Sequence, residues 1–387
     1  MVSIEDALKL IDQQDINLVS DELPLAQSLD CHLAKEVTAP FDLPSFDNSA
    51  MDGYAVCGQS TTFEIVGEVA AGNTDSFELS EGQAMRIFTG GRVPENTTAV
   101  IMQEKTSIEG NSLKLDEEVV PGKNVRRKGA EISEGQLVFE KGHKITPATM
   151  GVLSSLGIAN VSVFQQPVIH VMATGNELIE PGKEKKDGQI YESNSQTLDG
   201  ALQHQGFYCG ERKTIHDDLD AISDAIADDL KRCDVLLITG GISVGDYDYV
   251  KQALEENEVE EIFYKVKQKP GKPLYFGRRD DQFVFALPGN PASSLTCFYI
   301  YVLPLLQRLS GGAGKGLLRV NVPLKESFHF KSDRPTFLKA IIEESEVTIL
   351  DGQGSSMIHS MARSNALAFM DEIGEKAKGE MVECLLI

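Results

Sequence analysis

The stretch PVIHVMATGNEL, residues 167–178, decides which fold the chain is expected to adopt. It opens with a nearly continuous apolar run and ends in a polar turn that begins at Thr174. A strand without polar alternation is buried on both faces, which is typical of a parallel sheet covered by helices. The stretch therefore predicts a sheet strand whose carboxyl end carries a polar loop.

The surrounding segment, 166–310, continues with alternating strand and helix patterns. We expect strands at 206–213, 234–239, 261–267 and 283–287, and helices at 194–205, from an Asp217 cap to Lys231, near 246–257 and from Pro291 to Leu309. This alternation predicts a doubly wound, mostly parallel α/β sheet.

The rest of the chain differs in its residue pattern. Ser3 and Asp6 form a capping pattern that opens a short helix. Short β-branched runs between Gly, Asn and Pro clusters make 40–135 a predicted β-rich domain, and alternating strands follow the glycine-rich linker 310–316. The predicted fold class is α/β plus β, in several domains.

Composition limits the possible partners and the compartment. The chain has 387 residues and a formal charge of −23, so its surface repels nucleic acid and anionic membranes. Its 6 cysteines are scattered without a C-x-x-C pair, which predicts free thiols in a reducing cytoplasm and neither a zinc cluster nor a disulfide framework. The N-terminus is acidic, unlike a signal peptide, and no apolar stretch reaches the roughly 18 residues of a membrane span. A cytoplasmic protein is expected.

Polar loops follow the buried strands of the α/β segment: TGNEL (174–178), TGGISVGDYDY (239–249) and LPGNPASS (287–294). Each alone is most simply a tight turn, but together they should meet at the carboxyl edge of the sheet, where open α/β folds bind ligands. Backbone amides near Ser243 and the start of the helix at Pro291 favour anions. The predicted ligand-binding residues of these loops are Gly240, Gly241, Ser243, Gly245, Pro288, Gly289, Asn290 and Pro291.

A lysine cluster interrupts the acidic background in YKVKQKPGKP, 264–273. It comprises Lys265, Lys267, Lys269 and Lys272. Such clusters are often solvated surface, but the Pro-Gly turn between them brings ammonium groups together. An anion site for phosphate or another tetrahedral oxyanion is the favoured interpretation.

Acidic residues crowd the same predicted edge: Glu177, Asp217, Asp246 and Asp248. A carboxylate about 4 Å from a phosphate oxygen costs on the order of 4 kcal/mol at an effective dielectric near 20. A hard cation such as Mg²⁺ resolves this conflict, and Glu177 and Asp248 are its predicted ligands. Each acid alone is equally well a helix cap or a solvated side chain, and for Asp217 capping carries at least equal weight.

A polar loop, LPSFDNSAMDGYA at 43–55, lies in the β-rich segment together with RIFTGG at 86–91. One interpretation is a loop that bonds its own backbone through Asp, Asn and Ser. The other is that this polar loop, with Asp47, Asn48, Ser49 and Asp52, reaches across a cleft, within one chain or between two, and completes the metal and phosphate site built on the sheet.

With these motifs and NVRRKG (124–129) in order, the chain resembles the MoeA family of molybdopterin molybdenumtransferases, which is related to the C-terminal part of gephyrin. The resemblance covers essentially the whole chain. It implies an α/β domain (1–19 and 166–312), a linking domain (20–39 and 136–165), a β-rich domain (40–135) and a C-terminal β-barrel domain (313–387). It also implies a homodimer whose active site is completed by the partner's β-rich domain.

The resemblance further implies a reaction, in which molybdate enters adenylylated molybdopterin, AMP is released and Mg²⁺ is required. The implied transient partners are a molybdopterin-adenylating protein and molybdoenzyme apo-proteins or their chaperones. The family's functional positions correspond to Asp52, Thr89, Glu177, Asp217, Asp248, Lys265, Lys269, Pro288 and Pro291, with Lys272 as a further anion ligand.

The chain departs from the family pattern at Asn176, Ala130 and Ala366. Two alternatives stay open. One is nucleotidyl transfer to the pterin, a reaction that would not need the β-rich segment. The other is a gephyrin-like scaffold, but the chain has no long linker that could tether partners.

Overall fold

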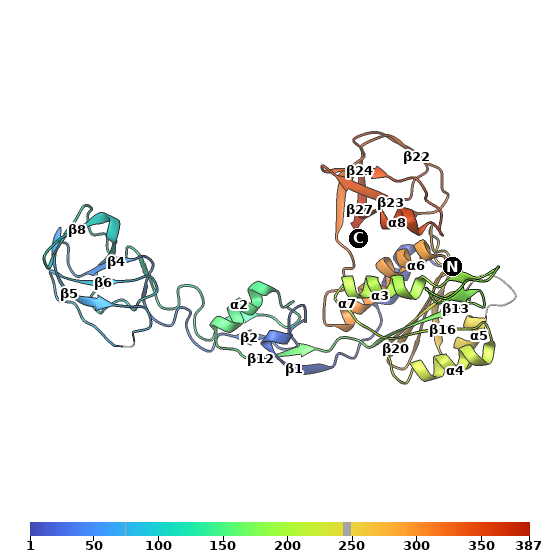
Figure 1. Cartoon of the computed structure of the whole chain (residues 1–387), viewed down its shortest axis with the longest axis horizontal. Helices are drawn as coiled ribbons and strands as arrows, with labels where there is room; N and C mark the ends of the chain where they lie inside the picture. The colour runs from blue at the N-terminus through green and yellow to red at the C-terminus, as the bar shows by residue number, and fades with distance from the viewer. Residues whose placement is uncertain (74, 243–248) are drawn as a thin grey trace. The chain divides into compact units, whose positions relative to one another are not determined.

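The computed structural model describes residues 1–73, 75–242 and 249–387 (Figure 1). These residues form two units with separate internal contacts. The first unit comprises Met1–Asp21, Asp30–Ala34 and Ser162–Ile387, and the second comprises Glu22–Leu29 and Lys35–Val161. The division into four domains with the boundaries given above stays a prediction.

A six-stranded sheet organises the first unit, in the order β16-β13-β17-β20-β19-β18. Its strands are β13 (Ile169–Thr174), β16 (Cys209–Ile215), β17 (Val235–Thr239), β18 (Glu260–Tyr264), β19 (Tyr275–Arg279) and β20 (Gln282–Leu287). Strands β16, β13, β17 and β20 are parallel, whereas β19 and β18 add an antiparallel edge. The mostly parallel sheet is confirmed; β19 was missed because its Gly and two Arg break the apolar pattern expected of a strand.

Helices cover both faces of this sheet. The helices on one face are α1 (Ile4–Asp12), α3 (Asn194–His204), α6 (Pro291–Cys297) and α7 (Leu303–Leu309), and those on the other are α4 (Leu219–Asp229) and α5 (Tyr249–Glu256). Neighbouring strand residues alternate between the two cores, since Val171 packs with the first set and Met172 with the second. Burial on both faces explains why the strands read as continuous apolar runs.

The helix starts follow capping chemistry. Ser3 accepts a hydrogen bond from the Asp6 amide, as expected. The α4 cap differs from the prediction: Asp218, not Asp217, accepts the Ala221 amide at 2.9 Å. The long helix expected from Pro291 to Leu309 is present, with a π-helical segment, Phe298–Val302, between α6 and α7. Pro304, which lacks an amide proton, follows that segment.

The C-terminal part of the first unit is a five-stranded antiparallel sheet in the order β21-β27-β25-β23-β24. Its strands are β21 (Arg319–Pro323), β23 (Thr336–Glu343), β24 (Glu346–Ile349), β25 (Ala366–Met370) and β27 (Met381–Leu386). A small pair, β22 (Phe328–Phe330) and β26 (Gly374–Lys376), and the short helix α8 (Ile358–Ala362) complete it.

The second unit holds a six-stranded sheet in the order β7-β4-β6-β5-β9-β8. Its strands are β4 (Gly53–Val56), β5 (Thr62–Val69), β6 (Gln83–Ile87), β7 (Ala99–Met102), β8 (Thr106–Glu109) and β9 (Ser112–Leu115). Adjacent residues of β4 enter opposite cores, Tyr54 on one face and Ala55 on the other. The same unit contains helix α2 (Pro147–Ser155), which Thr146 caps. No helix among the described residues is long and apolar enough to cross a membrane.

Candidate active site

A cavity of about 570 Å³ lies at the carboxyl edge of the α/β sheet. The ends of β13, β17 and β20 and the first residues of α3 line it. The predicted site residues in its wall are Glu177, Asp217, Gly240, Gly241, Pro288, Gly289, Asn290 and Pro291. The structure therefore brings together residues from all three polar loops that follow the strands.

Two carboxylates form one side of this cavity. Asp217 is half-buried, and its burial and the neighbouring Glu177 carboxylate raise its pKa above the ordinary value. Its amide donates a hydrogen bond to Asn176 Oδ1 at 3.1 Å. The departure at Asn176 therefore supplies an acceptor that holds the Asp217 backbone. Neither Glu177 nor Asp217 forms an ion pair with any residue in the described ranges.

The glycine pair after β17 is explained by packing against β13. A Cβ at Gly240 would lie 2.3 Å from the Thr174 carbonyl oxygen, and one at Gly241 would lie 2.8 Å from the Thr174 hydroxyl. Both residues have positive φ. Their missing side chains let the loop pack on the end of β13. At Gly289, by contrast, the nearest described atom to an added Cβ would be Gly240 Cα, at 3.5 Å.

The loop after β20 is tied to its surroundings by side chains. The Thr239 hydroxyl donates to the Pro288 carbonyl at 3.4 Å, and Asn290 Nδ2 donates to Ser355 Oγ at 3.1 Å. Pro291 begins α6, as expected. Ser356, from the C-terminal part of the unit, also lines the cavity.

A buried lysine organises the segment that carries Ser356. Lys339 Nζ donates to the carbonyl oxygens of Gly352, Gly354 and Met357 at 2.7, 3.0 and 3.1 Å. Burial lowers the pKa of this ammonium. The three carbonyl groups thus surround a cation that belongs to the protein itself.

Asn194 is a cavity residue that sequence reasoning missed. Its Nδ2 donates to the Gly289 carbonyl at 2.7 Å and to Thr239 Oγ1 at 2.8 Å, so it connects the loops after β17 and β20. No long apolar strand precedes Asn194, so the rule that found the other cavity residues did not apply to it. The feature of the sequence that could have indicated it is the polar run Glu-Ser-Asn-Ser at the start of a predicted helix.

The predicted lysines are not among the described residues of the cavity wall. Among the described residues that line the cavity, Lys265, Lys269 and Lys272 do not appear, although Pro273 at the end of their segment does. Lys265 Nζ lies 4.4 Å from the centre of the Tyr264 ring, and Lys269 pairs through its backbone with Thr336 of the C-terminal sheet. Ser243, Gly245 and Asp248 fall outside the described residues.

In the second unit, Asp52 and Thr89 form a pair. Asp52 Oδ1 accepts hydrogen bonds from the Thr89 amide at 2.7 Å and from the Thr89 hydroxyl at 2.8 Å. These bonds lower the pKa of Asp52, which therefore stays ionised in an exposed position. Ser49 bonds within its own loop to Met51, whereas Asp47 binds Arg127 at 2.6 Å. The loop is thus only partly self-bonded.

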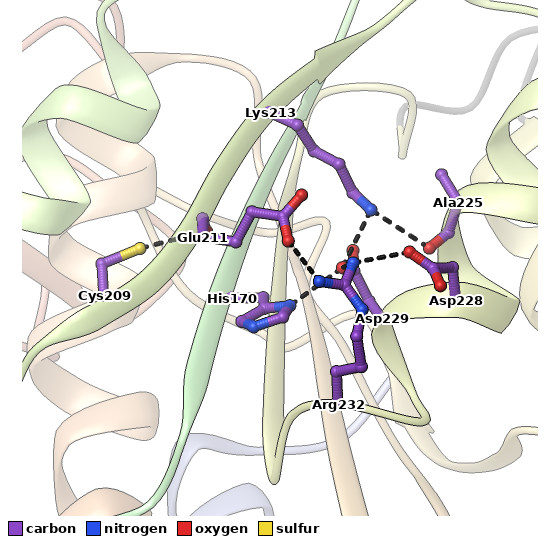
Figure 2. Close-up of polar contacts among 8 residues, drawn as sticks. All are labelled: His170, Cys209, Glu211, Lys213, Ala225, Asp228, Asp229 and Arg232. Atoms are coloured by element: carbon purple, nitrogen blue, oxygen red, sulfur yellow. Dashed lines mark hydrogen bonds and ion pairs between the residues drawn. The ribbon is translucent and has the colours of Figure 1, made fainter.

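A second polar cluster of the first unit surrounds Asp229, whose side chain is fully buried at the end of α4 (Figure 2). Its Oδ1 lies 2.9 Å from His170 Nδ1, 2.8 Å from Lys213 Nζ and 3.6 Å from an Arg232 nitrogen. Arg232 also binds Glu211 at 2.6 Å. Oxygen and nitrogen atoms of His170, Glu211 and Asp229 lie within 4.8 Å of one another, as metal ligands would. Two protein cations already neutralise these acids, however, so the arrangement is an ion-pair cluster.

Sequence comparison places these features in one class of protein. The N-terminal region model of MoeA (domains I and II) matches residues 2–157, a probable molybdopterin-binding domain matches 170–308, and the MoeA C-terminal region (domain IV) matches 321–387. The second match contains the sheet except Ile169 and all residues of the cavity wall except Ser356. The class is therefore a molybdopterin-binding α/β domain joined to MoeA-type flanking regions.

Full-length relatives agree with this assignment. The molybdopterin molybdenumtransferase of Haemophilus influenzae is 33% identical, covering 99% of this chain and 98% of the relative. That of Staphylococcus epidermidis is 29% identical over 95% and 91%. A molybdopterin biosynthesis MoeA structure from Pyrococcus horikoshii OT3 superposes with a TM-score of 0.86 at 28% identity over the whole of both chains. This chain belongs to the MoeA family.

Proposed function

We propose that this protein is a molybdopterin molybdenumtransferase that inserts molybdate into adenylylated molybdopterin and releases AMP. The observation that carries the proposal is the cavity at the sheet edge, whose wall, apart from Ser356, belongs to the part of the chain that matches a probable molybdopterin-binding domain. The full-length likeness to enzymes of that name supports the reaction.

The donor set of the cavity fits a divalent cation. Glu177 and Asp217 line one side, burial and then the neighbouring Glu177 raise the pKa of Asp217, and no Lys, Arg or His is among the described residues of the cavity wall. Carboxylate oxygens are the ligands that Mg²⁺ prefers. Glu177 and Asp217 would hold the ion, together with Asp248 as predicted from the sequence. When bound, Mg²⁺ would supply charge neutralisation at the phosphate oxygens.

The chain's own residues supply binding and orientation. Lys265, Lys269 and Lys272 hold the phosphates or molybdate, and the loop after β20 positions the substrate through Pro288, Gly289 and Asn290. This assignment of the lysines rests on their charge in an acidic chain, since they do not line the described cavity.

Asp52 orients the cleavage of the AMP linkage in this proposal. Its two hydrogen bonds from Thr89 keep it ionised, as an acceptor or proton-holding group must be. Because Asp52 belongs to the second unit and the cavity to the first, we infer that a homodimer brings the two together, with one subunit completing the site of the other.

The cellular setting follows from the same proposal. The protein receives its substrate from a molybdopterin-adenylating protein in the cytoplasm and delivers the finished cofactor to molybdoenzyme apo-proteins or their chaperones. Its charge of −23 disfavours binding to nucleic acid.

The decisive experiment mixes purified protein with adenylylated molybdopterin, molybdate and Mg²⁺. We expect molybdenum cofactor and AMP to form. Formation of an AMP ester from ATP and molybdopterin would instead identify an adenylyltransferase. Binding without turnover would identify a scaffold.

A further inference from the structure

The orientation of the Asn194 carboxamide is fixed by its neighbours. Asn194 Nδ2 lies 2.7 Å from the Gly289 carbonyl oxygen and 2.8 Å from Thr239 Oγ1. A carbonyl oxygen only accepts hydrogen bonds, so the amide nitrogen must point toward Gly289 and the amide oxygen must point away from it. The Asn194 side chain therefore cannot flip, and the atom that it presents on the other side is the acceptor Oδ1.

That acceptor lacks a partner. Asn194 Oδ1 is buried, and no described residue donates a hydrogen bond to it. The Thr174 hydroxyl, at the end of β13, is also buried in this wall, where it faces the Asp217 carboxylate as a donor, and no described residue donates a hydrogen bond to it. Buried polar groups in proteins are nearly always paired, so two neighbouring acceptors without a donor in the wall of one cavity favour a ligand that carries donors.

The nearby Glu192 side chain shows that only Asn194 Oδ1, and not the whole start of α3, lacks hydrogen-bond partners. Glu192 is buried two residues before Asn194, and both of its oxygens are satisfied by Ser195, one by the amide at 2.9 Å and the other by the hydroxyl at 2.6 Å. The first turn of α3 therefore has its internal hydrogen bonds in place. Only the group directed by Gly289 and Thr239 is left without a donor.

We propose that Asn194 determines specificity for the pterin ring, with its Oδ1 accepting a hydrogen bond from the ring's exocyclic amino group. The inference rests on the proposed function for the identity of the substrate. Both the pterin and the adenine of that substrate carry an amino group on a fused pyrimidine. In the pterin, however, a ring N–H lies beside the amino group and gives two adjacent donors, which match the two acceptors that lack a donor, Asn194 Oδ1 and the Thr174 hydroxyl oxygen. Adenine offers its amino group beside ring nitrogens that only accept.

The test compares pterin with lumazine, which carries an oxygen in place of the amino group. Ring fluorescence measures the affinity of each for the full-length protein. We expect the wild type to prefer pterin by about tenfold, the ratio that a single well-placed hydrogen bond provides. Asn194→Ala should lower this ratio toward one. A ratio that Asn194→Ala leaves unchanged would overturn the inference.

A matched control separates recognition from folding. Asn257 is also buried in the α/β part of the first unit, where its Nδ2 binds Ser223 and the Ala253 carbonyl, but it does not line the cavity. Asn257→Ala should lower thermal stability and leave the pterin-to-lumazine ratio as in the wild type. If it changes the ratio as much as Asn194→Ala does, general loosening explains the effect and the inference fails.

A second ligand pair tests the choice of ring. AMP and IMP differ in the amino group of the purine, and Asn194→Ala should not alter their affinity ratio. If it alters that ratio and not the pterin-to-lumazine ratio, Asn194 faces the adenine and the assignment to the pterin is wrong. Cofactor synthesis by the wild type is scored separately. If the wild type discriminates between pterin and lumazine but makes no cofactor, the proposed function is wrong. If it makes cofactor but the Asn194→Ala substitution does not change the pterin-to-lumazine ratio, only this inference is wrong.

Discussion

His170 and Thr174 lie near opposite ends of β13, and the polar groups around them differ in how their charges are balanced. Around His170, the buried Asp229 carboxylate has Lys213 and Arg232 within ion-pair distance (Figure 2). Beyond Thr174, Glu177 and Asp217 face a cavity whose described lining contains no Lys, Arg or His, although His216 acts on the Asp217 carboxylate from outside that lining. One sheet therefore carries a neutralised cluster at its amino end and an unneutralised one at its carboxyl end. The first stabilises the fold, and the second is available to a ligand.

The largest expected effect is at the neutralised end. Asp229→Ala leaves Lys213 without its buried partner and should lower the free energy of unfolding by about 3–5 kcal/mol. Denaturant unfolding, followed by circular dichroism, measures the change. Asp228→Ala is the control, because Asp228 binds the same Arg232 from an exposed position and should cost at most about 1 kcal/mol. Equal losses in the two variants would show that burial of the cluster is unimportant.

A second contrast lies within the cavity wall. Gly240→Ala should destabilise the protein by about 1–3 kcal/mol, because its Cβ would collide with the Thr174 carbonyl and its φ of +94° is strained for alanine. Gly289→Ala has room for a methyl group and should leave thermal stability nearly unchanged. If both variants fold equally well, the glycine pair after β17 is not required for packing on β13.

Asp217 should respond to pH and to Mg²⁺. Its raised folded-state pKa means that the stability it contributes is present below the ordinary Asp pKa and is lost as pH rises through the folded pKa. Asp217→Asn should remove this dependence and weaken Mg²⁺ binding by at least about tenfold. Thermal unfolding between about pH 4 and 7, with and without Mg²⁺, measures both effects. A variant that is as sensitive to Mg²⁺ as the wild type would exclude Asp217 from the proposed metal site.

The smallest effect concerns the Asp52 carboxylate, which is stabilised mainly by its hydrogen bonds from Thr89 and also by the charge of Arg86. Thr89→Val removes the hydroxyl bond to Asp52 but keeps the amide bond, so the pKa of Asp52 should rise and yet stay below that of a free Asp. NMR titration of the Asp52 carboxyl measures the change. Thr89→Ser retains the hydroxyl and should titrate like the wild type. An unchanged pKa in Thr89→Val would show that the hydroxyl contributes nothing to holding Asp52.

Much of the fold was predictable because buried parallel strands are apolar along their whole length. Val235–Thr239 and Gln282–Leu287 could be recognised in this way, whereas Tyr275–Arg279 could not, because its glycine and two arginines interrupt the apolar run although the strand is paired on both sides. The cap of α4 was misplaced by one residue, since Asp217 and Asp218 are adjacent and sequence alone does not show which side chain turns toward the helix.

The site was predictable where a loop directly follows such a strand. Glu177, Gly240 and Gly289 were found for that reason, and all line the cavity. Asn194 was missed because it precedes a helix and its role depends on a contact with Gly289, far away in the sequence. The lysines near Pro270 were grouped by charge, but charge alone does not determine whether a flexible side chain points into a cavity.

The Lys339 ammonium has a further consequence for how the cavity responds to its surroundings. Three carbonyl groups hold it as they would hold a small ion, and it cannot be washed out because it is part of the chain. The part of the wall that carries Ser356 should therefore keep its shape in a chelator, and only the part with Glu177 and Asp217 should report whether metal has been withdrawn.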